Sequence, residues 1–461
     1  MPLIKSISGI RGTIHPEDNE GLSTQEIIQS VNQLTNWLIE NSPNKIYKIA
    51  VGRDARISGE SISIKIINHL ISLGINIIDL GLTTTPTLQI AVSEITCDAG
   101  IMITASHNPV DWNGLKFLNN LGEFLTYNQS MKVYVSSTKS RELAHKKGSV
   151  EKLDFMLNHI ENVINLSDVD LDKIRTRKFK VVVDGINSSG GIYVPFLLEK
   201  LSCNVIKLNC KPDGRFEHNP EPVPRNLKKL SKMVKETGSD LGIAVDPDVD
   251  RLVLICEDGS FFNEENTIVA VTKHILENHN NLNVVTNLST TTAVKELVNK
   301  NNGNHFESAV GETNVVEMMK LKKSILGGEG SGGVIFKPSH YGRDALVAIC
   351  LILSYLAIKK ISLKELLGTL PKYFMIKDKI IFDEKNNNKI QKYIDKKVEF
   401  CKQNKIKFSE IDGLKMWFDD KTWVHIRKSN TEPLLRLIVE SFSSENAKKI
   451  KQLIIKEITF F

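Results

Sequence analysis

Short apolar runs rich in β-branched residues alternate with helical stretches along most of this chain. In the first third, residues 48–52, 75–80, 100–103 and 115–118 have the length and composition of strands, and residues 61–73 have a helical pattern. Strands separated by helices of this length favour parallel or mixed sheets built from α/β units. The chain is therefore predicted to be an α/β protein.

The alternation continues in two further sets and then changes. The later predicted strands are residues 179–185, 205–208, 241–245, 283–286 and 324–326, and a helix follows Arg343. From about residue 372 the helices and strands no longer alternate regularly, which predicts an α+β terminal domain. Because 461 residues are too many for one core, we expect four domains, at residues 1–150, 151–257, 258–372 and 373–461. The polar residues 136–152 are expected to connect the first two.

Composition and charge argue against several classes of protein. The 60 basic and 54 acidic residues leave a net charge of only +6, and basic runs with interleaved aromatic residues are few, so no nucleic-acid partner is expected. No run approaches the roughly 18 apolar residues of a membrane span, and residues 345–358 predict a buried helix. The N-terminus lacks a signal-peptide pattern, and the six cysteines form no CxxC pair. We expect a cytoplasmic protein with reduced thiols and no membrane partner, either a monomer or a homodimer.

A reactive hydroxyl is predicted at Ser106. The segment Thr-Ala-Ser-His-Asn-Pro at residues 104–109 follows an apolar run that predicts a buried strand. A serine in this place is held on a rigid scaffold, but it is a weak nucleophile unless a base takes its proton or it already carries phosphate. We interpret the adjacent His107 as a group that orients the serine. Lys116, after the turn-like residues 111–114, could polarise or help deprotonate a substrate hydroxyl.

Alternating aspartates predict a metal site. Asp246, Asp248 and Asp250 lie within the segment Asp-Pro-Asp-Val-Asp-Arg, and in a loop they can converge on one ion. Their oxygens suit Mg²⁺, which binds few protein ligands together with phosphate oxygens. Two alternatives stand beside this interpretation, an acidic turn capped by Arg251 and a calcium loop ending at Glu257. The calcium loop requires glycine where Arg251 stands and helical flanks, whereas the flanks here predict strands.

Two further segments offer ligands for a polar substrate. Residues 327–333, Gly-Gly-Glu-Gly-Ser-Gly-Gly, allow close approach to the backbone, with Glu329 and Ser331 as hydrogen-bonding groups, although a flexible turn is the alternative. Residues 427–433, Arg-Lys-Ser-Asn-Thr-Glu-Pro, predict a phosphate cradle, with an exposed polar turn as the alternative. The candidate anion ligands there are Arg427, Ser429, Asn430, Thr431 and Arg436.

Two segments near the N-terminus combine arginine with glycine. Residues 8–12 place Arg11 between two glycines, and residues 52–59 contain two arginines around Asp54. We expect an arginine–aspartate pairing within residues 52–59 and interpret that segment as structural rather than catalytic.

Taken together and in this order, the segments resemble the α-D-phosphohexomutase superfamily along the whole chain. Residues 104–109 resemble its phosphoserine loop, and residues 246–251 resemble its metal loop. Residues 328–332 resemble its sugar-binding loop, and residues 427–433 resemble its phosphate-binding loop. The resemblance implies four domains in a heart-shaped arrangement around a central cleft, three related α/β domains and a smaller α+β domain.

The resemblance also implies a mechanism. Phosphorylated Ser106 would give its phosphoryl group to a hexose phosphate, and the resulting hexose 1,6-bisphosphate, which also serves as activator, would turn over and return its other phosphate to Ser106. Mg²⁺ would be held by Asp246, Asp248, Asp250 and a phosphate oxygen on Ser106. The other implied catalytic residues are Arg11, Lys116, His107 and Arg251. The implied substrate ligands are Glu329, Ser331, Arg343, Arg427, Ser429, Asn430, Thr431 and Arg436.

Two departures from the family pattern affect the sugar site. Many relatives have histidine where Gly333 stands, and bacterial relatives often have a histidine-bearing segment at residues 310–314. We expect His340 or Arg343 to supply part of the missing contact. The Gly-Gly-Glu-Gly-x-Gly-Gly and Tyr-Gly-Arg-Asp segments look most like phosphoglucosamine mutases, which convert glucosamine 6-phosphate to glucosamine 1-phosphate. The alternatives are phosphomannomutase or phosphoglucomutase activity, a hydrolase, and a non-catalytic sugar-phosphate-binding protein on the same scaffold.

Overall fold

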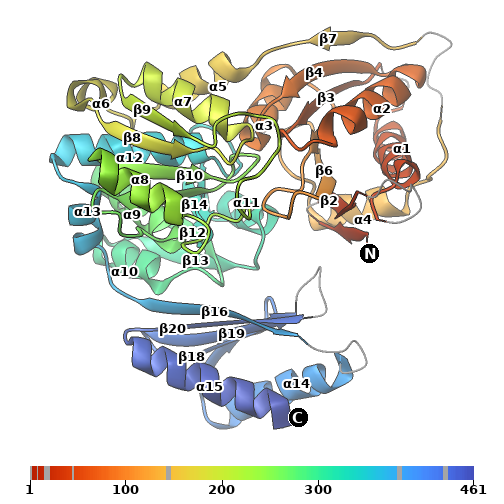
Figure 1. The fold of residues 1–461 in the computed structure, drawn as a ribbon. Helices are drawn as coiled ribbons and strands as arrows, with labels where there is room; N and C mark the ends of the chain where they lie inside the picture. The colour runs from red at the N-terminus through yellow and green to blue at the C-terminus, as the bar shows by residue number, and fades with distance from the viewer. Residues whose placement is uncertain are drawn as a thin grey trace.

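Four sheets, each formed by a separate stretch of the chain, organise the protein (Figure 1). The computed structural model describes residues 3–7, 9–14, 21–43, 46–141, 147–381, 387–428 and 434–460, and all structural statements refer to these residues. The expectation of a chain with several α/β units and an α+β C-terminal unit is confirmed.

The first sheet has seven strands in the order β1-β2-β6-β5-β3-β4-β7 within the described residues. Its central strands β3, β4 and β5 are parallel, and β6 runs antiparallel to β5. The strands are β1 Ile4–Ser6, β2 Gly9–Thr13, β3 Lys48–Arg53, β4 Asn76–Leu82, β5 Ala99–Ile103, β6 Trp112–Leu118 and β7 Val150–Lys152. The helices of this unit are α1 Thr24–Asn41, α2 Gly59–Ser72, α3 Thr85–Glu94 and α4 Tyr127–Val135.

The second and third sheets repeat one topology, with orders β11-β10-β8-β9 and β13-β12-β14-β15. The second unit comprises α5 Met156–Ile164, α6 Leu171–Arg177, β8 Lys180–Asp184, α7 Gly190–Lys200, β9 Asn204–Leu208, α8 Lys228–Thr237, β10 Leu241–Val245 and β11 Leu252–Cys256. The third comprises α9 Glu264–Asn278, β12 Asn283–Asn287, α10 Thr292–Lys300, β13 Asn304–Ser308, α11 Glu312–Leu321, β14 Leu326–Glu329, β15 Gly333–Phe336, α12 Ala345–Lys359 and α13 Leu363–Thr369.

In all three units, three parallel strands are followed by one antiparallel strand that pairs with the third. The loop before that antiparallel strand connects β5 to β6, β10 to β11 and β14 to β15. These three loops contain Ser106, the aspartates 246–250 and the glycine-rich residues 330–332. Topologically equivalent positions therefore supply the serine, the acidic cluster and the predicted sugar loop.

Two predicted local structures are wrong. Residues 112–114, predicted as part of a turn, belong to β6, where they pair with β2. Gly114 is required there because a Cβ would lie 2.5 Å from the carbonyl oxygen of Ile10, so close packing of two strands, not a turn, explains the glycine. The strand predicted at residues 324–326 lies at Leu326–Glu329 instead, and the predicted glycine loop shortens to residues 330–332 because its two ends form β14 and β15.

One continuous apolar core joins the second and third units, and the first and fourth have cores of their own. Helix α12, which is buried from Ala345 to Ala357, packs on α6 and α9 at the centre of the shared core. Burying each large aliphatic side chain stabilises the fold by about 1.5–3 kcal/mol. Among the described residues no single helix has the length and hydropathy to cross a membrane; α12 and α13 pass that test only as a pair bent by 89°.

The fourth unit is a five-stranded sheet in the order β16-β20-β19-β18-β17. Its elements are β16 Phe374–Ile381, α14 Asn387–Gln403, β17 Lys407–Ser409, β18 Leu414–Asp419, β19 Thr422–Lys428, β20 Leu434–Ser441 and α15 Ser444–Phe460. In Figure 1 both helices cover the face of the sheet that is turned away from the other units. The opposite side of this unit therefore faces the loops of the third unit.

Candidate active site

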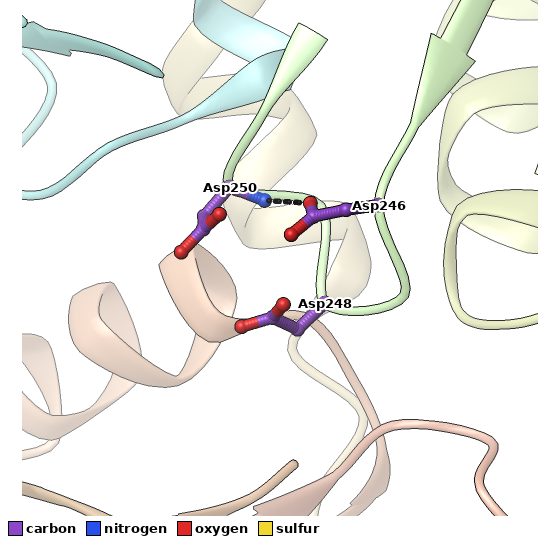
Figure 2. A group of neighbouring side chains, drawn as sticks. All are labelled: Asp246, Asp248 and Asp250. Carbon is purple, nitrogen blue, oxygen red and sulfur yellow. Dashed lines mark hydrogen bonds between the residues drawn. The ribbon is translucent and has the colours of Figure 1, made fainter. Parts of the chain in front are cut away.

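Asp246, Asp248 and Asp250 form a compact acidic cluster in the loop between β10 and β11 (Figure 2). All three are fully buried, and one oxygen from each lies within 4.8 Å of the others. The backbone N–H groups of Asp250 and Arg251 donate to Asp246 Oδ1 at 3.1 and 3.2 Å, which folds the loop back on its first residue. The antiparallel strands on either side exclude the helix–loop–helix geometry of the calcium-loop alternative.

The electrostatics of this cluster suit a hard divalent cation. Burial, with repulsion from Asp250 and Asp248, raises the pKa of Asp246 well above its ordinary value. Burial also acts to raise the pKa of Asp250, but Arg343 and Lys116 outweigh it and hold that pKa below its usual range. Asp248 Oδ1 and Asp250 Oδ1 are buried without a hydrogen-bond partner among the described residues. Two unsatisfied carboxylate oxygens beside a third carboxylate fit the donor set that Mg²⁺ prefers.

Ser106 lies against this cluster, although the two loops are 140 residues apart in the sequence. Its Oγ donates to Asp246 Oδ2 at 2.8 Å and lies 3.3 Å from His107 Nδ1. Burial, together with the charges of Arg251 and Arg11, lowers the pKa of His107 well below its ordinary value, so the imidazole is neutral near pH 7. A neutral ring beside the hydroxyl is consistent with an orienting role.

Cations from two strands of the first unit surround the serine loop and the cluster. Lys116 on β6 donates from Nζ to Asp248 Oδ2 at 2.6 Å and to Asp250 Oδ2 at 3.5 Å. Burial disfavours its charged form, but the two aspartates outweigh this and raise the pKa of Lys116, so it stays an ammonium. Arg11 on β2 donates to Asn108 Oδ1 at 3.1 Å, next to the serine.

Arg343 connects the acidic cluster to the predicted sugar loop. Its guanidinium donates to Asp250 Oδ2 and to Glu329 Oε2 at 2.6 Å each, and its Nε lies 3.0 Å from Glu312 Oε2. A Cβ on Gly333 would lie 2.3 Å from Arg343 Cδ, so the arginine fills the space beside the missing histidine side chain. Of the two residues expected to compensate for Gly333, the structure therefore places Arg343 there.

His340, the other candidate, belongs to a different cluster. Its Nε2 lies 3.2 Å from Asp344 Oδ2, and its ring meets that of His159 edge-on at a centroid distance of 6.4 Å. Ser331 lies at the tip of the sugar loop between β14 and β15. Arg251 extends from the metal loop, with its Nε 3.8 Å from Asp250 Oδ1.

The predicted phosphate cradle is only partly described. Arg427 on β19 lies opposite Arg436 on β20 in the strand register, so two guanidinium-bearing residues lie on neighbouring strands. Arg427 Nη1 lies 3.9 Å from Asp412 Oδ2, which also accepts from the backbone N–H of Val310 at 3.1 Å. Ser429, Asn430 and Thr431 lie outside the described residues, as does Ser8.

Three site residues were missed by sequence reasoning. Thr85, at the start of α3, donates from Oγ1 to Asp248 Oδ2 at 2.5 Å, and its backbone N–H donates to the Asp248 carbonyl at 3.0 Å. Burial raises the pKa of Glu312 to about 7 despite the neighbouring Arg343. Lys377 on β16 donates to the Gly330 carbonyl at 2.9 Å, which connects the fourth unit to the sugar loop. The run Thr-Thr-Thr-Pro after a strand signals a helix start at Thr85, but not its contact with Asp248.

Comparisons with known proteins cover the chain from end to end. Family models described as phosphoglucomutase/phosphomannomutase match it in four pieces: alpha/beta/alpha domain I at residues 4–144, domain II at 157–259, domain III at 263–374 and the C-terminal domain at 379–457. A protein of Thermococcus kodakarensis named "Phosphoglucomutase/phosphomannomutase" is 33% identical over 452 residues, which cover 97% of this chain and 96% of the relative.

A second relative has a different name. A protein of Methanopyrus kandleri named "Probable phosphoglucosamine mutase" is 30% identical over 448 residues, which cover 96% of this chain and 95% of the relative. The crystal structure of a phosphoglucomutase/phosphomannomutase family protein from Burkholderia thailandensis matches with a TM-score of 0.84 at 24% identity, covers 99% of this chain and 96% of that chain, and shows the shared fold.

Proposed function

Because the chain belongs to the phosphoglucomutase/phosphomannomutase family, we propose that it moves a phosphoryl group between the 6 and 1 positions of a hexose phosphate, with Ser106 as the phosphoryl carrier. The observation that carries the proposal is the 2.8 Å contact between Ser106 Oγ and Asp246 Oδ2. At this point a hydroxyl group of the first unit contacts a carboxylate of the second unit. Phosphoryl transfer needs a serine and a cation-binding cluster within reach of one phosphate.

In the first half-reaction the bond between phosphorus and Ser106 Oγ breaks while a sugar hydroxyl oxygen bonds to the same phosphorus. The sugar hydroxyl loses its proton, and Ser106 Oγ, the leaving oxygen, gains one, so the number of protons is unchanged and the product is a hexose 1,6-bisphosphate. After this intermediate turns over, the reverse transfer returns its other phosphate to Ser106. Lys116 stays protonated and therefore serves as a hydrogen-bond donor that stabilises charge on the transferring group. Arg11 and Arg251 add positive charge near His107, beside the serine.

The residues of the acidic cluster would hold one Mg²⁺. When bound by Asp246, Asp248 and Asp250 together with an oxygen on Ser106, the ion would neutralise the charge that develops on the phosphoryl oxygens. Glu329 and Ser331 would bind sugar hydroxyls, and Arg343 would hold Glu329 in place through its 2.6 Å bond. Arg427, Ser429, Asn430, Thr431 and Arg436 would bind the phosphate that is not being transferred.

Glucosamine 6-phosphate is the proposed substrate, with glucosamine 1-phosphate as product and glucose or mannose phosphates as the runner-up. The glycine-rich and Tyr-Gly-Arg-Asp segments support this choice, as does the name of the Methanopyrus kandleri relative. The name of the Thermococcus kodakarensis relative supports the runner-up. Arg343 outweighs the effect of burial and lowers the pKa of Glu329, so its carboxylate is ionised and able to pair with an ammonium.

Intact-mass measurement tests whether Ser106 carries phosphate. Incubation with glucose 1,6-bisphosphate and Mg²⁺ should add one phosphoryl group to the wild type and none to Ser106→Ala. Ser137→Ala, at an exposed serine of the same unit, is the matched control and should gain the group normally. A wild type that never gains phosphate would support the non-catalytic binding protein instead.

A coupled assay across glucosamine, glucose and mannose 6-phosphates tests the substrate. It is run with Mg²⁺ and the activating bisphosphate, and kcat/KM is compared between the three sugars. We expect the highest value for glucosamine 6-phosphate. A clear preference for glucose or mannose phosphate would overturn that choice while leaving the mutase proposal intact.

A further inference from the structure

The guanidinium of Arg56 lies buried beneath the loop that carries Ser106. Its side chain is inaccessible to solvent. Nη1 donates to the carbonyl oxygens of Pro109 and Trp112 at 2.6 and 2.8 Å. Nη2 donates to the carbonyl oxygens of Ser106 and Asn108 at 2.6 Å each. One side chain from another loop therefore holds three backbone carbonyls of the Ser106 loop and that of Trp112, the first residue of β6.

Two neighbours hold Arg56 itself in place. Asp54 Oδ2 lies 3.3 Å from Arg56 Nε, and Asp54 Oδ1 accepts from the Arg56 backbone N–H at 2.9 Å. The ring of Phe216, from the second unit, covers the guanidinium at 5.0 Å. The predicted pairing within residues 52–59 is therefore present, but it supports an arginine whose Nη donors all face the serine loop and the first residue of β6.

A second connection runs from Asp54 to the same serine. Thr104 Oγ1 donates to Asp54 Oδ2 at 2.6 Å and accepts from the backbone N–H of Ser106 at 2.9 Å. Ser106 has a φ of 49°, in the left-handed region that non-glycine residues rarely adopt. Hydrogen bonds to Thr104 and from Arg56 therefore fix both the backbone N–H and the carbonyl of Ser106, the residue whose hydroxyl donates to Asp246.

From these contacts we propose that Arg56, braced by Asp54, is a positioning residue for phosphoryl transfer, an inference that rests on the proposed function. It acts through the backbone of the Ser106 loop and touches no reacting atom. Only a guanidinium fits the geometry, because it offers five N–H donors in a planar fork, whereas a lysine ammonium offers three from a single atom. Loss of this anchor lets Ser106 leave its strained conformation.

The test compares Arg56→Lys with Arg53→Gln. Arg53 is half-buried in the same segment and donates to the Asp54 carbonyl at 3.2 Å, and among the described residues its side chain makes no hydrogen bond to the serine loop. For Arg56→Lys we expect kcat, and the rate of Ser106 phosphorylation by glucose 1,6-bisphosphate, to fall at least about 100-fold, the cost of misplacing a reacting group by about 1 Å. KM for the sugar phosphate should stay unchanged. Arg53→Gln should keep kcat within about twofold of the wild type.

A folded Arg56→Lys with kcat within threefold of the wild type would overturn the proposal, and so would a loss confined to KM. Thr104→Val, which removes the second connection while keeping the volume, decides the matter if Arg56→Lys does not fold. It should lower kcat at least about tenfold at unchanged KM, and a wild-type kcat would overturn the positioning role. If the proposed function itself is wrong, the wild type and Arg53→Gln will also fail to form phosphoserine, which separates the two failures.

Discussion

Replacing Gly333 by alanine would put a methyl group against Arg343, the residue that connects the metal loop to the sugar loop. The added Cβ would lie 2.3 Å from Arg343 Cδ and 3.1 Å from its Cγ. Since non-bonded carbon atoms pack at about 3.5–4.0 Å, the arginine side chain must move by about 1 Å or more. It cannot swing away freely, because its far end is bonded to Glu329 and Asp250 at 2.6 Å each.

A shift of this size stretches a 2.6 Å bond to about 3.6 Å, which is no longer a hydrogen bond. Each lost bond to a charged group costs about 1.5–3 kcal/mol. We therefore expect Gly333→Ala to lower the free energy of unfolding by that amount. We also expect a fall in kcat/KM of about 10- to 100-fold, because Glu329 moves with the arginine. Thermal unfolding by circular dichroism and the coupled mutase assay measure the two effects.

Gly368→Ala is the matched control, because a Cβ at Gly368 meets nothing within 4 Å. Gly368 lies in helix α13, where alanine should add up to about 1 kcal/mol of stability at unchanged kinetics. In the double variant Gly333→Ala/Arg343→Ala the collision is absent, so the combined loss of stability should be smaller than the sum of the single losses. A Gly333→Ala protein with the melting temperature and kcat/KM of the wild type would refute the reasoning.

Three further predictions concern charge. Lys116→Met should lower kcat by about 10²- to 10³-fold, the cost of losing one preorganised donor, yet tighten Mg²⁺ binding, since Asp248 loses an ammonium at 2.6 Å. Kinetics and calorimetric Mg²⁺ titration measure both effects, and weaker Mg²⁺ binding would count against this prediction. Burial and neighbouring carboxylates raise the pKa of Asp246, so protons compete with the metal for this carboxylate. The Mg²⁺-dependent rise in melting temperature should therefore be smaller at pH 6 than at pH 8, and equal rises at the two pH values would contradict this prediction. Burial acts to raise the pKa of Asp344, but the interaction with His159 outweighs burial and holds that pKa below its usual range. The carboxylate therefore stabilises the fold above about pH 4, and this stability is lost as the pH falls further. Asp344→Asn should therefore cost about 1.5–3 kcal/mol at pH 7, and the difference in melting temperature from the wild type should shrink below pH 4.

The strands were predictable wherever burial alone decides them. Residues 241–245 were predicted as a strand and form β10, with all five residues buried. Strands that are covered on both faces are continuous apolar runs, so the signal is local. Residues 112–114 show the opposite case, because their pairing with β2 on a distant part of the chain overrides the local turn signal.

Site residues were likewise predictable where their signal is local and not where it depends on a distant partner. Ser106 and the three aspartates could be picked out because each lies in a short segment with unusual chemistry at a strand end. Thr85 and Glu312 could not, because a threonine or glutamate at a helix start is ordinary until the partner across the fold is known. Arg56 was interpreted as structural from its neighbour Asp54, and its four bonds to the serine loop and the first residue of β6 join residues about 50 positions apart.

The sequence by itself determined the α/β class and the chemical groups available, because strand periodicity and side-chain type are local properties. Only the tertiary structure decided which groups meet. The second and third sheets and strands β6-β5-β3-β4 of the first share one strand order, which places the serine, the acidic cluster and the sugar loop at the same hairpin position. Hydrogen bonds and ion pairs depend on distance in space, not on separation along the chain, and so packing of the units brought Ser106 to Asp246 and Arg343 to Asp250.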